Sequence, residues 1–338
     1  MTFMNKRYFD KRISMRCCQG ASVVIRYCTV MYEQQTPTRS RELMHSFLLV
    51  LAAFIWGSAF VAQAVGATYV GPFTFLALRS LIGFSALFLF VMVRHTLAQA
   101  YLRAQNMEGV LPQLNPKTLI LGGLCCGTML FLASLTQQIG IGYTTAGKAG
   151  FITTMYVVIV PILMTFMGRP PGKKIILCVV LEVIGLYLLS IAGDFKLGFG
   201  DAMILVCAFL FALQIMCINY FVQRIDGVLL SCAQFLTVTV YAFVGMWLFE
   251  TPQIADISKA FPSILYAGLL SSGIAYTLQI IGQKGLNPSV ASLLMCLESV
   301  FSALSGFVIL HEILTVRELT GCALMFLAVV LSQIKLKS

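Results

Sequence analysis

The sequence has 338 residues, of which 59% are hydrophobic and 11% are charged, and its formal net charge is +10. Its mean hydropathy is +0.90. Because soluble domains devote about a quarter of their residues to charge, this composition excludes an ordinary water-soluble fold and indicates an exterior covered by lipid. The basic residues lie mainly between apolar runs and form no stripe interleaved with aromatic side chains, so we expect a lipid bilayer and no nucleic acid as a partner.

Residues 1–43 form a basic segment without an apolar run long enough to cross a bilayer. Two interpretations remain open for it. It is either a basic tail lying near anionic lipid, or the product of a start codon assigned too early, with Met44 as the true start. Met44 directly precedes the first apolar run, which favours the second interpretation.

Ten apolar runs follow, each close to the roughly 20 residues that a helix needs to cross the hydrocarbon core. They predict an all-α membrane protein with ten transmembrane helices. The predicted spans, in chain order, lie near 45–66, 72–94, 117–140, 145–167, 174–192, 200–223, 228–249, 259–283, 288–310 and 314–335. They divide the chain into two five-helix halves, 44–192 and 193–338.

Lys and Arg in the connections between spans set the predicted orientation. With the N-terminus inside, the outer connections hold only Lys196, Lys259 and Arg317. The inner connections and the C-terminal end hold Arg94, Arg103, Lys117, Arg169, Lys173, Lys174, Arg224, Lys284, Lys335 and Lys337. This bias predicts an integral, multi-pass protein of a bacterial cytoplasmic membrane with both termini in the cytoplasm.

A weak internal repeat relates the two halves. An offset of 142 residues pairs Tyr156 with Glu298, and an earlier offset of 155 residues pairs Arg79 with Gln234. Each half holds an odd number of spans, so the halves must be inserted in opposite orientations. Inverted repeats of this kind are typical of secondary transporters.

Small residues and one proline mark expected features of individual helices. Gly123 and Gly127 form a GxxxG pattern, which is expected to allow close helix contact. Pro161 is expected to interrupt span 4, because proline removes a backbone donor from the helix.

Three segments carry a resemblance to a known family. They are FIWGSAFVAQAVGATYVGPFTFLALRSLIG at 54–83, AGKAGFITTMYVVIVPI at 146–162, and LESVFSAL at 297–304 followed by HEILT. They resemble the EamA-like branch of the drug/metabolite transporter superfamily, and the similarity extends over 45–335. One departure is Ser299, where the family often places proline.

That resemblance implies a basket of ten helices in which spans 1, 3, 4, 6, 8 and 9 line a central cavity and spans 5 and 10 are peripheral. Members of the family commonly export amino acids or other metabolites, or carry nucleotide sugars. Uncharged substrate candidates are the aromatic and amide side chains on the cavity-lining spans: Trp56, Gln137, Tyr156, Tyr276 and Gln279.

Ionisable side chains inside membrane spans are costly and point to function. Glu298 lies near the middle of span 9, where it either binds a proton or a cation or fixes helix packing through hydrogen bonds. Lys148 lies about one turn into span 4. It could attract an anionic group of the substrate, pair with Glu298, or extend to the outer surface.

Three further polar residues are expected to be structural. Arg79 lies near the middle of span 2, which the resemblance places away from the cavity, so we expect it to clamp backbone carbonyls. Gln234 is its mate in the repeat. Glu182 lies in peripheral span 5, where packing or assembly is the default interpretation.

The sequence has no phosphate-binding loop of the GxxxxGK[ST] type, which excludes ATP-driven transport within this chain. Its 11 cysteines and 3 histidines show no metal-ligand spacing, so we expect no cofactor and no metal. These features favour a secondary transporter that works by alternating access, with proton coupling through Glu298 as a further hypothesis. The resemblance implies export of a small metabolite, such as an amino acid or a similar amphipathic solute. A channel and a membrane-embedded enzyme remain alternatives, and the choice between monomer and homodimer stays open.

Overall fold

A computed structural model describes the chain over 39–104, 115–144, 146–190, 198–310 and 315–334. Within these ranges the chain is helical and contains no strand. Predictions about 1–38 and about 105–114 in the longest inner loop lie outside the described residues.

The chain divides into two compact units. One consists of Met1–Pro37 and Met92–Pro112, and the other of Thr38–Val91 and Gln113–Ser338. The first unit contributes only the end of one helix, from Met92 onward, to the described residues. The cavity and the side-chain contacts of the candidate site lie within the second unit, the bundle.

Helices of the first half follow predicted spans 3 to 5 closely, whereas the helix at span 1 begins at Arg39 rather than 45 and the helix at span 2 ends at Ala104 rather than 94. They are α3 (Arg39–Ala67), α4 (Pro72–Ala104), α5 (Pro116–Ile141), α6 (Ala146–Thr153), α7 (Tyr156–Phe166) and α8 (Lys173–Ser190). Local capping signals fix where α5 begins. The Asn115 side chain accepts a hydrogen bond from the Thr118 amide, and Pro116 occupies the first turn, where a backbone donor is not needed.

The second half begins with α9 (Phe199–Phe221) and α10 (Gly227–Phe249), and the Asp226 side chain caps α10 by accepting from the Leu229 amide. The remaining elements are α11 (Ile254–Tyr266), the π-helix η1 (Ala267–Ala275), α12 (Tyr276–Gln283), α13 (Pro288–Met295), α14 (Leu297–Leu310) and α15 (Val316–Gln333). The α11–η1–α12 series forms one long span that begins earlier than the predicted residue 259.

Nine segments of the described chain are long and apolar enough to cross a membrane. They correspond to predicted spans 1 to 4 and 6 to 10. The fifth predicted span corresponds to α8. Its 18 residues include three charged ones, Lys173, Lys174 and Glu182, so α8 is too charged to count among the nine. The count of ten spans therefore stays a prediction.

Spans 4 and 9 are interrupted. Span 4 breaks at Thr154 and Met155, between α6 and α7, whereas Pro161 lies inside α7, so the predicted position of the interruption was wrong. Span 9 breaks at Cys296, between α13 and α14. The Cys296 thiol donates to the Thr154 carbonyl at 3.4 Å, so the two interruptions lie against each other.

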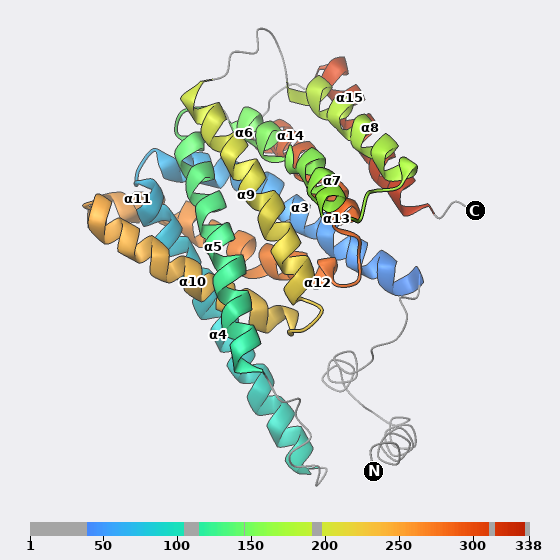
Figure 1. The fold of residues 1–338 in the computed structure, drawn as a ribbon. Coiled ribbons are helices and arrows are strands. Elements are labelled where there is room, and N and C mark those ends of the chain that lie inside the picture. Colours follow the sequence, from blue (N-terminus) through green and yellow to red (C-terminus); the bar gives the residue numbers. More distant parts are fainter. Residues whose placement is uncertain (1–38, 105–114, 145, 191–197, 311–314, 335–338) are drawn as a thin grey trace, which may run out of the picture. The chain divides into compact units, whose positions relative to one another are not determined.

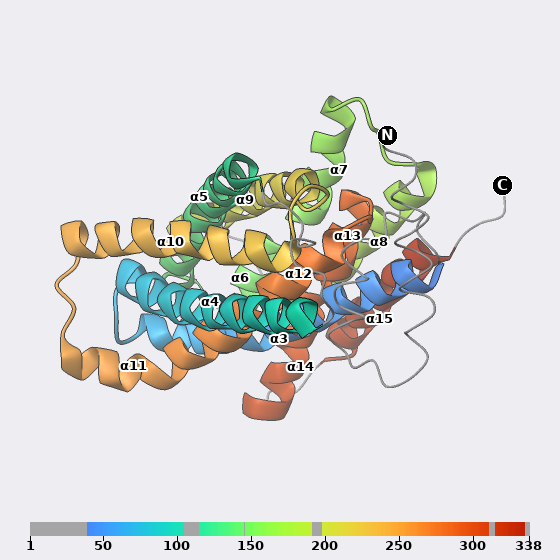
Figure 2. The same cartoon turned by 90° about the horizontal axis from the view of Figure 1, so that it is seen from below.

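Small residues bring neighbouring helices together. A side-chain carbon at Gly123 would lie 2.7 Å from Ala233 Cβ, and one at Gly127 would lie 2.5 Å from Thr237 Cβ. The GxxxG pattern thus packs α5 against α10, as predicted. The helices α8 and α15 lie side by side (Figure 1), and α5 lies beside α9 in both views (Figure 2).

Large apolar side chains cover much of the exterior of the bundle. Phe47, Leu89 and Trp247, for example, are 64%, 65% and 81% exposed. Polar side chains such as Arg79 and Glu298 are instead buried among the helices. An apolar exterior around a polar interior is what a helical bundle surrounded by lipid requires.

Candidate functional site

A cavity lies among the helices of the bundle. It is lined by Trp56, Phe60, Gln63, Arg79, Gln137, Thr153, Tyr156, Phe211, Ile215, Ser271, Tyr276, Gln279, Met295 and Glu298. Its volume, measured for the centres of water molecules, is about 30 Å³. Because about 10–15 Å³ by this measure holds one water, this conformation has room for water but not for a metabolite.

Most of the substrate candidates named from the sequence line the cavity. Spans 1, 3, 4, 6, 8 and 9 all contribute to the lining, as the resemblance implied, and span 2 joins them through Arg79. The candidates on its wall are Trp56, Gln137, Tyr156, Tyr276, Gln279 and Glu298, whereas Lys148 lies outside it. The role of these residues as substrate contacts stays a prediction.

One wall of the cavity is aromatic. The rings of Trp56 and Tyr276 meet edge to face with centroids 4.8 Å apart, and Phe235 packs behind Tyr276 at 5.5 Å. The indole Nε1 of Trp56 has no hydrogen-bond partner among the described residues. An apolar face with an unused donor suits the body of an amphipathic solute.

Amide side chains form a second part of the wall. The Gln137 Nε2 donates to Thr153 Oγ1 at 3.3 Å, and the Gln279 Nε2 donates to Gln214 Oε1 at 3.2 Å. The other end of the Gln279 amide, Oε1, is buried and has no partner within the described part of the chain. Buried polar atoms normally find a partner, so such an atom is open to water or to a ligand.

Glu298 lies where the interrupted spans 4 and 9 meet. It is 4% exposed, and the Tyr156 hydroxyl donates to its Oε1 at 3.1 Å. These are the two residues that the 142-residue offset pairs. The adjacent Ser299 hydroxyl lies 3.2 Å from Thr154 Oγ1 and 3.4 Å from the Gly150 carbonyl. Where the family often has proline, this chain therefore has a hydroxyl that links spans 4 and 9.

The structure places Arg79 at the cavity wall rather than away from it. Its side chain is 3% exposed, and its Nη1 donates to Gln63 Oε1 at 3.1 Å instead of to a backbone carbonyl. The guanidinium carbon lies 5.9 Å from the centroid of the Phe75 ring. Its Nε has no partner among the residues described. The expected clamp on backbone carbonyls does not form in this structure.

The other two residues expected to be structural lie outside the cavity lining. Gln234 on α10 is fully buried, and neither polar atom of its side-chain amide has a partner in the described ranges. Glu182 on α8 is also fully buried, and the same holds for both of its carboxyl oxygens. Nothing in the geometry brings either residue to the cavity.

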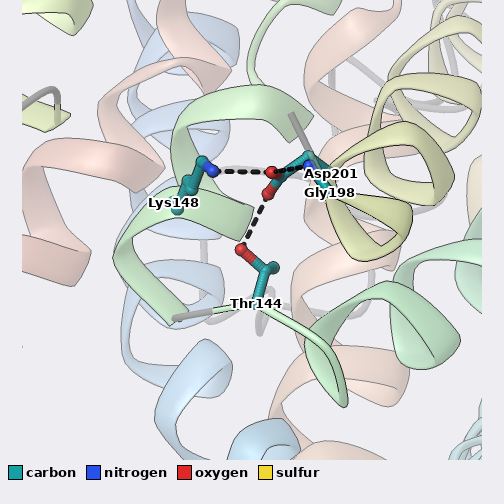
Figure 3. A network of polar contacts seen from close by, with 4 residues as sticks. All are labelled: Thr144, Lys148, Gly198 and Asp201. Atoms are coloured by element: carbon teal, nitrogen blue, oxygen red, sulfur yellow. Dashed lines mark hydrogen bonds and ion pairs between the residues drawn. The ribbon is translucent and has the colours of Figure 1, made fainter. Parts of the chain in front are cut away.

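Lys148 forms an ion pair with a residue that the sequence reasoning missed. Its Nζ lies 2.6 Å from Asp201 Oδ2, and Asp201 also accepts from Thr144 Oγ1 and from the Gly198 amide, both at 2.8 Å (Figure 3). Because Asp201 lies in the first turn of α9, its negative charge also complements the helix dipole. The pair joins the beginnings of α6 and α9, and the alternative of a pair between Lys148 and Glu298 is not realised.

Local signals could have found two of the missed residues. Asp201 follows Gly198 by three positions at a helix start, a typical N-terminal acidic signal. Gln63 comes seven residues after Trp56 in the same helix, so the two side chains share a face. The apolar lining residues Ile215 and Met295 carry no comparable signal.

Comparisons with known proteins agree with this architecture. A transporter of Archaeoglobus fulgidus, named as uncharacterized, is 27% identical over 288 residues, which are 85% of this chain and 85% of that protein. The uncharacterized transporter YoaV of Bacillus subtilis is 24% identical over 288 residues, covering 82% of this chain and 92% of its own. A solved crystal structure superposes with a TM-score of 0.66 at 18% identity, covering 87% and 97% of the two chains, which shows a shared fold alone.

The family comparison reaches most of the sequence. Residues 43–191 and 198–333, two consecutive stretches, match the EamA-like transporter family. Together with the apolar helices, this match makes the protein an integral, multi-pass membrane protein and a transporter. The chain belongs to the EamA-like transporter family.

Proposed function

We propose that this membrane transporter is a secondary carrier that moves a small amphipathic metabolite, such as an amino acid, out of the cell by alternating access. An inverted repeat of two five-span halves, with both termini in the cytoplasm of a bacterial cell, is part of the same proposal. The observation that carries it is the hydrogen bond between Tyr156 and Glu298 at the wall of the cavity.

That hydrogen bond supports a two-fold relation between the halves. Two residues related by a two-fold axis can touch each other only if both lie close to the axis. Tyr156 and Glu298 are 142 positions apart and in contact, and so are Thr154 and Cys296. Both contacts favour an axis that passes between spans 4 and 9, beside the cavity.

The interruptions of spans 4 and 9 supply places where these helices can bend. Interrupted helices near the membrane midplane are typical of carriers in which one repeat moves against the other. The cavity volume of about 30 Å³ requires such a movement before a metabolite can enter. An exchange of conformation between the halves would open the cavity to one face while closing it to the other.

Glu298 is the proposed coupling group. A protonated carboxyl group can donate a hydrogen bond, whereas an ionised one only accepts, as Glu298 does from Tyr156 in this geometry. Release of the proton toward one face and uptake from the other would link substrate movement to the proton gradient.

Counterflow in proteoliposomes tests the proposal, after a thermal-shift screen of metabolites has selected solutes that bind. Preloaded vesicles should accumulate labelled solute. Removal of the coupling carboxyl in Glu298→Gln should lower proton-driven flux by at least about tenfold without lowering the folded yield. The matched control is Glu182→Gln, which removes a second buried carboxyl outside the cavity and should change flux by less than about twofold.

Two results would contradict the proposal. Unitary currents without counterflow would identify a channel. Wild-type flux and wild-type proton dependence in Glu298→Gln would remove Glu298 from the mechanism.

A further inference from the structure

The Arg79 side chain carries a charge that the bundle leaves uncompensated. A guanidinium stays protonated in proteins, and Arg79 is 3% exposed inside an apolar span. Its guanidinium makes one hydrogen bond, to Gln63, and lies over the ring of Phe75. Among the described residues, no carboxylate lies within ion-pair distance of it.

An uncompensated charge at this depth is expensive. Removing an ion from water costs several kcal/mol unless a partner of opposite charge and further hydrogen bonds replace the solvent. This chain does supply such a partner elsewhere, because Lys148 has Asp201 at 2.6 Å. The position of Arg79 at a cavity wall indicates that its counter-ion enters from the cavity.

The free part of the guanidinium limits what that counter-ion can be. Nη1 is occupied by the Gln63 amide, while Nε has no partner in the described residues. The edge formed by Nε and Nη2 presents two parallel N–H groups, which match the two oxygens of a carboxylate.

The rest of the cavity fixes the other end of the ligand. Glu298 is the second ionisable acid or base in the lining besides Arg79, apart from the tyrosine hydroxyls, and its Oε1 is already bonded to Tyr156. The rings of Trp56 and Tyr276 form an apolar part of the wall, beside the amide side chains of Gln137 and Gln279. A compact anion attached to an apolar body therefore fits the lining.

We propose that Arg79 binds the carboxylate of the transported solute, so that the substrates are small organic carboxylates with an apolar body. This inference rests on the proposed carrier function and deepens it. The two can fail separately, because a carrier of amines or neutral solutes would still show counterflow.

Binding to the purified full-length protein tests the assignment. The probes are leucine, phenylalanine and 3-phenylpropionate, the amide of each, and phenyl phosphate, measured by thermal stabilisation and then by counterflow. At least one carboxylate should stabilise the wild-type protein. Its amide should bind at least about tenfold more weakly, the loss expected when a charge-assisted bidentate contact is removed.

Two variants separate the role of Arg79 from a role in folding. Arg79→Lys keeps the positive charge but loses the two parallel N–H groups of the guanidinium, and should weaken carboxylate binding by about tenfold or more. Gln63→Glu is nearly isosteric and places a carboxylate directly against Arg79 Nη1, so it should abolish carboxylate binding while the protein folds normally. The control Lys259→Gln removes a positive charge from an exposed pair with Asp256 and should leave binding unchanged.

Three outcomes would overturn the inference. The first is stabilisation by the amides that equals or exceeds that by the carboxylates. The second is stabilisation by phenyl phosphate alone, or by no probe in the set. The third is unchanged carboxylate binding in a folded Gln63→Glu protein.

Discussion

Arg79 and Lys148 are two cationic side chains within apolar spans, and their surroundings are opposite. Lys148 lies at the beginning of α6 and is paired with Asp201, which is itself held by Thr144 and Gly198. Arg79 lies deeper, at the cavity, and its guanidinium has only the neutral Gln63 amide as a hydrogen-bond partner in the described chain.

This difference separates a charge that holds helices together from a charge that stays available to a ligand. An ion pair with partly buried partners and extra hydrogen bonds contributes to folding. A buried charge without a counter-ion destabilises the fold, and it is retained where function requires it. Stability and binding should therefore respond in opposite ways at the two sites.

The largest effect on stability is expected at Asp201. Asp201→Ala removes the ion pair and two further hydrogen bonds, so we expect a loss of about 2–4 kcal/mol in the free energy of unfolding. Reversible unfolding in mixed detergent micelles measures it. Asp256→Ala, which breaks an exposed pair, is the control and should cost less than about 1 kcal/mol. An unchanged stability for Asp201→Ala would show that the pair does not hold α6 to α9.

A smaller loss is expected at the other end of the pair. Lys148→Met should cost about 1–2 kcal/mol of unfolding free energy, because Asp201 keeps its hydrogen bonds from Thr144 and Gly198. The double variant Lys148→Met/Asp201→Ala should lose about 1 kcal/mol less unfolding free energy than the sum of the losses in the two single variants. Strict additivity would mean that the two side chains do not interact.

At Arg79 the stability effect should be small and binding should be lost. Arg79→Met replaces an uncompensated charge by an apolar side chain of similar length, so we expect a change in unfolding free energy within about 1 kcal/mol. Carboxylate binding should disappear in the same thermal-shift assay. A stability loss in Arg79→Met comparable with that of Asp201→Ala would show that Arg79 has a structural role instead.

The smallest effect is expected on the aromatic wall. Trp56→Phe keeps a ring against Tyr276 but removes the unpartnered indole donor, so apparent substrate affinity should change about two- to threefold. Counterflow at several substrate concentrations measures this. A complete loss of transport would show that the indole N–H, and not the ring face, contacts the substrate.

Nine of the ten spans predicted from hydropathy are present in the described chain, because the length of an apolar helix is a local property of the sequence. The interruptions at Thr154 and Cys296 were not predicted, because they depend on a contact between positions 142 residues apart. The π-helix η1 contains no proline, and the one proline of the same span, Pro262, lies in the preceding helix α11. The position of η1 is likewise set by packing rather than by composition.

The sequence predicted which spans surround the cavity, but not every residue that lines it. The resemblance supplied those spans, and aromatic and amide residues on them then lay on the cavity wall. The position of Arg79 could not be derived this way, because it depends on how α4 is rotated about its own axis. Asp201 was overlooked because it lies in the first turn of a predicted span, where an acidic residue is ordinary.

The central claim is that one cavity opens alternately to the two faces of the membrane, and labelling of Ser271→Cys tests it most directly. Ser271 lines the cavity and is 2% exposed, so in a cysteine-depleted protein its thiol should react with an impermeant maleimide only when the cavity opens. We expect labelling in both right-side-out and inside-out vesicles, slowed on both sides by a solute that binds. Labelling confined to one side, whatever solute is present, would contradict alternating access.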